Sequence, residues 1–147
     1  MSNIELNEQE AGRRASLQQL EALGINPYPA EMFPVNVTTT EIKEGYDPEK
    51  GNFENVVIAG RIMSRRIMGA ASFIELQDEE GRIQVYIKRD EICPGEDKTL
   101  YNTVFKKLLD IGDIIGIEGY AFITQTGHLS VHAKGLKLLS KSLRVLP

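Results

Sequence analysis

Residues 72–88 alternate apolar and polar side chains on both sides of a short polar turn, DEEG (78–81). A period of two residues is that of a β-strand with one buried face, so this stretch predicts a β-hairpin. If those four residues form the whole loop, Gln77 faces Arg82 and the earlier pairs follow in step. The predicted core-facing pairs are Ile74 with Val85, Leu76 with Ile83, and Ser72 with Ile87. A slip of one residue would turn every apolar side chain outward, so the hairpin strongly constrains the fold.

Three further strands and one helix are predicted around this hairpin. The expected strands are 56–67, 72–77, 82–88, 113–124 and 128–139, and the expected helix is 97–110. Gly60 interrupts the first strand and indicates a bend there. Three strands, a helix and two strands are the element order of an OB-fold, a small five-stranded Greek-key barrel. We therefore expect a mainly β domain over residues 55–147.

The first 54 residues have a different pattern. A helix is expected from an N-cap at Asn7, with Glu10 completing a capping box, to a stop at Gly24. Residues 24–52 are rich in Pro, Thr and Gly, and three prolines exclude regular structure from their first part. A connector of this length is expected to pack on the barrel. The chain thus divides into an N-terminal attachment, 1–54, and a barrel, 55–147.

The charge of the chain is unevenly distributed. The 147 residues carry a formal net charge of −4, which by itself argues against a nucleic-acid partner. Residues 1–55 hold ten acidic and four basic side chains, whereas 56–147 hold eleven acidic and thirteen basic. The end of the chain adds basic groups that could hold phosphates, namely Lys134, Lys137, Lys141 and Arg144. Local charge therefore leaves nucleic acid open as a partner.

The solvent-facing side of the predicted hairpin is unusual for a polar face. It places Phe73 beside Tyr86 and Glu75 beside Gln84. A base can stack on such a ring while an amide or guanidinium hydrogen-bonds its edge, and Arg65 and Arg66 on the preceding strand could assist. The alternative is that the N-terminal helix or the connector covers the two rings. The pattern alone does not separate these interpretations.

No catalytic or metal-binding pattern stands out. The chain has no P-loop and no H-E-x-x-H motif. His128 and His132 are the two histidines, and in a strand a spacing of four residues separates them by roughly 13 Å, too far for a shared metal. The acidic triplet 78–80 lies in a turn, and the single Cys93 has no base near it. The residues therefore predict a binding module and no metal or cofactor in this chain.

A lone cysteine is typical of a reducing compartment, and the first residues show no secretory signal. No apolar run approaches the length of a membrane span. We therefore expect a cytoplasmic protein without a membrane partner.

Several strings resemble the N-terminal anticodon-binding domain of bacterial class II lysyl-tRNA synthetases. They are GINPYP (24–29), AGRIMSRRIMGAASFIELQDEEGRIQVYI (59–87), FKKLLDIGDIIGIEG (105–119), TQTGHLSVH (124–132) and LLSKSLRVLP (138–147). The likeness runs from about residue 12 to the end, and the PYP connector and the LSKSL ending point to the lysyl branch.

The resemblance implies an OB-fold that binds the anticodon of tRNA(Lys). It places the family's stacking aromatic at Phe73, its edge-reading amide at Gln84 and its anticodon-contacting arginine at Arg66. Further tRNA contacts are expected among Arg65, Tyr86, Glu75 and His128. In the family, a large catalytic domain follows in the same polypeptide and uses ATP and Mg to attach lysine to tRNA, as a homodimer. This chain lacks the catalytic motifs, so we expect a domain of such a ligase and no catalysis by this chain alone.

Two positions depart from the family pattern. Ala70 stands where Lys is usual, and His128 stands where a Glu helps to read the anticodon. A neutral imidazole can accept a hydrogen bond there, but an imidazolium cannot. Two other functions remain open: a protein-interaction or dimer-support module whose rings are covered, and a single-strand binder without sequence preference.

Overall fold

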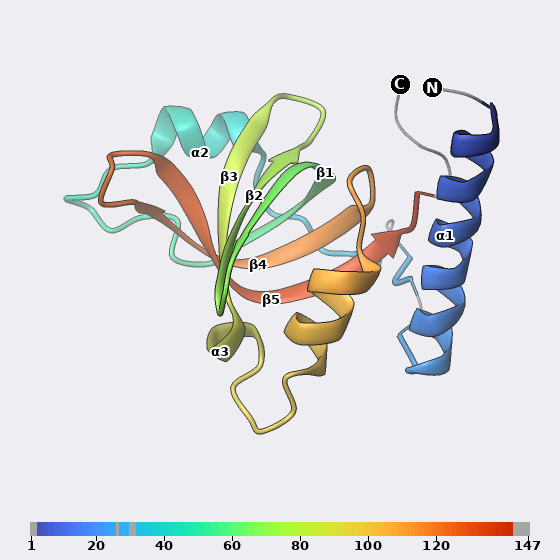
Figure 1. The fold of residues 1–147 in the computed structure, drawn as a ribbon. Coiled ribbons are helices and arrows are strands. Elements are labelled where there is room, and N and C mark those ends of the chain that lie inside the picture. Colours follow the sequence, from blue (N-terminus) through green and yellow to red (C-terminus); the bar gives the residue numbers. More distant parts are fainter. Residues whose placement is uncertain (1–2, 26, 30–31, 143–147) are drawn as a thin grey trace.

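The predicted strands close into a five-stranded barrel in a computed structural model, which describes residues 3–25, 27–29 and 32–142 (Figure 1). The strands are β1 (Val56–Met68), β2 (Ala71–Gln77), β3 (Arg82–Lys88), β4 (Ile114–Ile123) and β5 (Leu129–Ser140). Their order around the barrel is β1–β2–β3–β5–β4, and only the β3–β5 pair is parallel. This mixed barrel, with a helix between β3 and β4, confirms the predicted OB-fold.

The register of the first hairpin is also confirmed. Gln77 pairs with Arg82, Glu75 with Gln84, and Phe73 with Tyr86. The alternate residues point inward and are almost fully buried, as the alternation predicts. They are Ser72, Ile74, Leu76, Ile83, Val85 and Ile87.

β1 pairs with two neighbouring strands along its length. Its first half pairs with β4 and its second half with β2, with a bulge between Ile62 and Ser64. A Cβ atom on Gly60 would lie 2.6 Å from the Gln77 carbonyl oxygen, so the close strand approach requires glycine there. The bulge thus follows Gly60, where the sequence predicted a bend, and β1 changes partner at Arg61.

The helices are α1 (Asn3–Ala22), α2 (Thr39–Gly45), α3 (Arg89–Ile92) and η2 (Leu100–Leu108). The predicted N-cap at Asn7 is wrong, because the helix already begins at Asn3 and no glycine or proline in that turn stops it. Gly24 has φ +80°, so the predicted stop is confirmed. None of the helices in the described ranges is long and apolar enough to span a membrane.

The helix expected over 97–110 is shorter and wider than predicted. It is a π-helix over 100–108, and the amide of Leu109 donates to the Val104 carbonyl, five residues back. The wider turn brings several large side chains onto one buried face: Tyr101, Val104, Phe105, Leu108 and Leu109. The Arg65 guanidinium donates hydrogen bonds to two carbonyls at the end of this helix, those of Phe105 (3.0 Å) and Leu109 (2.6 Å).

The connector lies against the barrel at several points. The Phe33 ring fills the space that Gly116 of β4 leaves open, and the Tyr28 amide donates to Leu138 of β5 at 2.7 Å. The helix α2 within the connector was not predicted, although its capping box, Thr38 with Glu41, is visible in the sequence. These contacts locate the connector, and the division of the chain at residue 54 stays a prediction.

Candidate nucleic-acid interface

The outward face of the β2–β3 hairpin carries the two aromatic residues that the alternation placed there. The rings of Phe73 and Tyr86 lie 4.8 Å apart between centroids and are tilted by 32°. Both side chains are half-buried, so each keeps part of its ring surface open. Among the described residues, α1 borders neither of the hollows next to these rings, and Lys43 of α2 is the one connector residue that does. The two rings are therefore accessible from the hollows.

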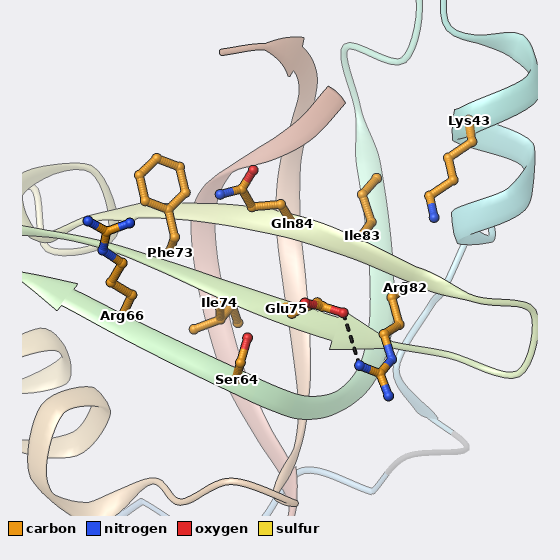
Figure 2. A pocket seen from close by; sticks show the side chains of 9 residues that line it. All are labelled: Lys43, Ser64, Arg66, Phe73, Ile74, Glu75, Arg82, Ile83 and Gln84. Atoms are coloured by element: carbon orange, nitrogen blue, oxygen red, sulfur yellow. Dashed lines mark hydrogen bonds and ion pairs between the residues drawn. The ribbon is translucent and has the colours of Figure 1, made fainter. Parts of the chain in front are cut away.

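Two hollows adjoin this pair of rings. Phe73, Gln84 and Arg66 border both of them. Their volumes, about 440 and 730 Å³, lie in the range of small-ligand sites. Figure 2 shows the Phe73 ring between the Arg66 guanidinium and the Gln84 amide, all three rising from the same side of the strands. A flat ring flanked by a cation and an amide can hold a base by its face and its edge at once.

The two neighbouring arginines of β1 point to different surroundings. Arg66 pairs with Phe73 across the β1–β2 ladder and is exposed at the hollows. Arg65 is instead half-buried against η2, with its guanidinium 5.9 Å from the Phe105 ring centre and bonded to the two carbonyls given above. Because its charge is committed to the helix end, we leave Arg65 out of the proposed interface.

Glu75 and Arg82 form an exposed ion pair at the edge of the first hollow. Their closest atoms, Glu75 Oε1 and Arg82 Nη1, lie 3.1 Å apart, and Arg82 Nε donates to Gln77 at 2.7 Å. Exposed pairs of this kind contribute about 0–1 kcal/mol to stability. In this pair Glu75 Oε1 already accepts a hydrogen bond from Arg82 Nη1.

Lys43 is a member of the first hollow that the sequence did not indicate. It extends from α2 toward the hairpin turn, and its Nζ lies 4.0 Å from the position a Cβ on Gly81 would take (Figure 2). α2 is held there by Asp78, which accepts from the amide and the hydroxyl of Thr39, each at 2.9 Å. The capping box in the sequence could have revealed the helix, but not that it faces this hollow.

The ionisation of Asp78 reflects this anchoring. Burial alone would raise the pKa of the Asp78 carboxyl, but hydrogen bonds from the amides of Thr39, Glu80 and Gly81 and from the Thr39 hydroxyl outweigh it. The net pKa is lowered, so the carboxylate is ionised at neutral pH and accepts all of these bonds.

The rings continue beyond the hairpin onto β4 and β5. Tyr86 lies 6.1 Å from Phe122 and 5.3 Å from His132, and His132 stacks on Tyr120 at 4.8 Å. The structure brings these residues next to the hairpin because β5 pairs in parallel with β3. Sequence reasoning missed this extension, since a parallel neighbour leaves no local signal.

His132 is the one histidine of this row and is buried. Its Nε2 lies 3.8 Å from the Glu91 carboxylate and, within the described part of the chain, has no hydrogen-bond partner. Burial lowers the pKa of His132, and the nearby Glu91 only partly opposes this. A neutral imidazole packed among rings follows from this setting.

His128 borders the second hollow from the β4–β5 turn. Its side chain is exposed, and its amide donates to the Thr124 hydroxyl at 3.1 Å, which orders the turn. The residue that departs from the family pattern thus faces the same hollow as Phe73 and Gln84.

The basic groups near the end of the chain do not act as one patch. The side chain of Lys141 is 2% exposed and bonded to Asp110 and Asp113, so it does not reach a phosphate. Lys134 lies over the Tyr120 ring at 5.2 Å and Lys137 over the Tyr28 ring at 4.8 Å. Arg144 lies outside the described residues.

A closed OB barrel with half-open rings, an amide and a guanidinium on its β1–β3 surface defines a domain for binding unpaired nucleotides. A family described as "OB-fold nucleic acid binding domain", named for the tRNA anticodon, matches residues 56–139. The chain belongs to this family of anticodon-binding OB-fold domains, in the form found in lysine–tRNA ligases.

The relatives make the assignment specific. A lysine–tRNA ligase of Porphyromonas gingivalis is 60% identical over 148 aligned residues, which cover 100% of this chain and 26% of that protein. The lysine–tRNA ligase of Christiangramia forsetii is 62% identical over 97% of this chain and 24% of its own length. That of Azobacteroides pseudotrichonymphae is 59% identical over 97% of this chain and 28% of its own. The chain therefore spans about a quarter of the relatives it matches.

Proposed function

We propose that this chain binds the anticodon of tRNA(Lys) as the anticodon-recognition domain of a lysine–tRNA ligase. The observation that carries the proposal is the Phe73 ring set between the Arg66 guanidinium and the Gln84 amide at the border of two hollows. Phe73 stacks the central base, and Arg66 and Gln84 hydrogen-bond its edge. Tyr86 extends the stacking surface, and Glu75 and His128 line the hollows around it.

The activity of the whole protein follows from the same proposal. A catalytic domain of the same polypeptide would attach lysine to the bound tRNA with ATP and Mg, in a homodimeric cytoplasmic enzyme. The support is the identity of about 60% to lysine–tRNA ligases across all of this chain. The chain itself supplies recognition through the residues that border the two hollows.

A titration of this chain with a labelled anticodon stem-loop of tRNA(Lys) tests the proposal. Phe73→Ala should weaken binding by about 1–3 kcal/mol, the usual worth of a base–aromatic stack. Tyr28→Ala is the matched control. Tyr28 is, like Phe73, a half-buried aromatic residue, but it lies beneath Lys137 and borders neither hollow. Equal losses for the two variants would contradict the role of Phe73.

The same titration separates the other two functions. A stem-loop with a scrambled loop should bind at least tenfold more weakly if the anticodon is read. Equal affinity for both loops with a steep salt dependence would identify a single-strand binder without sequence preference. Absence of salt-dependent binding to either loop would favour a protein-interaction module.

A further inference from the structure

Ser130 lies beneath the proposed base-reading amide. It is fully buried on β5 and stands opposite Gln84 in the parallel β3–β5 ladder. Its hydroxyl donates to Gln84 Oε1 at 3.1 Å, and the other acceptor in reach, the His128 carbonyl, is more distant at 3.4 Å. A serine hydroxyl has a single hydrogen, so it serves one acceptor at a time. The shorter contact assigns that hydrogen to the glutamine oxygen.

The donated bond favours one end of the amide at the hollow. A glutamine carries two donors on its nitrogen and an acceptor on its oxygen, and rotation by half a turn exchanges them. With Oε1 directed to Ser130, the nitrogen Nε2 is directed toward Phe73, as Figure 2 shows. In the reverse rotamer Nε2 would donate to the hydroxyl, which would then have to give its own hydrogen to the more distant His128 carbonyl at 3.4 Å, and the glutamine oxygen would turn to the ring.

We propose that Ser130 is a positioning residue that holds Gln84 as a donor and thereby sets base specificity at Phe73. The inference rests on the proposed anticodon binding and deepens it. A base stacked on Phe73 then meets N–H groups, so the site favours uracil, which offers its O4 carbonyl oxygen where cytosine carries an amino group. Cytosine is disfavoured because its amino group would face the amide N–H groups across the same gap.

The first test measures selectivity. Two anticodon stem-loops that differ only in U or C at the central position are titrated against the unmodified chain, Ser130→Ala and Ser130→Thr. Ser130→Ala should lose about two- to tenfold of the preference for U, the worth of one hydrogen bond. Ser130→Thr keeps the hydroxyl and should retain the preference. Gln84→Glu removes the donor, so adding Ser130→Ala to it should change the U-to-C ratio no further.

A structural role for Ser130 gives a different result. If Ser130→Ala weakens binding to both stem-loops equally, or if the ratio is unchanged, the serine fills space and the inference is overturned. If the unmodified chain binds neither stem-loop, the anticodon-binding proposal fails first, and the specificity role falls with it.

The second test needs no RNA and so separates the two failures. The side-chain amide signals of isotope-labelled Gln84 are followed by NMR relaxation in the free chain. We expect an ordered amide in the unmodified chain and in Ser130→Thr, and a mobile one in Ser130→Ala. Equal mobility in all three would overturn the positioning role whatever the RNA titrations give.

Discussion

The two faces of the β2–β3 hairpin differ in what their side chains do, although they alternate along the same strands. Ile74 and Val85 face inward and are at most 1% exposed. Their neighbours in the sequence, Phe73 and Gln84, face outward and border the hollows. Because successive side chains point to opposite sides of a strand, the two sets lie on different faces of the hairpin, although Ile74 and Ile83 also line the first hollow. The comparison teaches that stability and recognition are separable here, residue by residue.

The inward face is tested by Leu76→Ala, because Leu76 borders neither hollow. Removing a fully buried leucine side chain leaves a cavity and should lower the free energy of unfolding by about 2–5 kcal/mol. Urea denaturation measures this loss. Affinity for the anticodon stem-loop, measured where the variant is still folded, should stay within about twofold of the unmodified chain. A large loss of affinity in the folded variant would show that the two faces are coupled.

The hairpin turn carries Asp78, which anchors α2. The substitution Asp78→Ala tests how much this anchor contributes to stability and to RNA binding. The substitution removes the anchor of α2 and should cost about 2 kcal/mol of stability, as hydrogen bonds to a charged group do. It should also weaken RNA binding slightly, because Lys43 is carried by α2. Asp78→Asn keeps an acceptor oxygen and should show a smaller loss in the same urea denaturation. Equal losses for Asn and Ala would show that the charge carries the effect, and no loss in either variant would show that both the charge and the acceptor are dispensable.

How far the sequence predicted these features depends on how local they are. The hairpin, its register and its outward Phe73 follow from alternation around one turn, and the structure shows them as predicted. The positions of Lys43, Ser130 and His132 depend on contacts between distant segments, such as α2 against the turn and β5 beside β3. The width of η2 was missed because a period of 3.6 and a wider turn place similar residues inward over nine residues.

Lys43→Ala tests whether the outward face extends beyond the barrel. The slope of log K against log salt is negative, and one lost phosphate contact should make it less steep by about 0.7, the value for single strands. Affinity at moderate salt should fall only a few-fold. Lys50→Ala is the matched control, an exposed lysine of the same connector that borders neither hollow. If both variants leave the slope unchanged, the recognition surface ends at the strands.

His132 does not fit the division into a buried inward face and an open outward face. It belongs to the outward row of rings and is nevertheless buried. Burial lowers its pKa in the folded chain below the ordinary value of 6.5. The unfolded chain therefore takes up a proton as the pH falls through about 6.5 while the folded chain does not, so folding stability should decrease below that pH.

Urea denaturation at pH 7.5 and pH 5.5 measures this loss. His132→Phe should reduce it, and His128→Gln, at the exposed histidine, should not. Asp78 does not contribute in this window, because its lowered pKa moves its own loss to more acidic pH. The groups that face the imidazole are Glu91, Lys88 and Lys134, and Glu91→Gln should enlarge the loss by removing the one charge that favours protonation. If the loss is the same in His132→Phe, the buried histidine is not its source, and the outward row of rings does not contribute to stability through protonation.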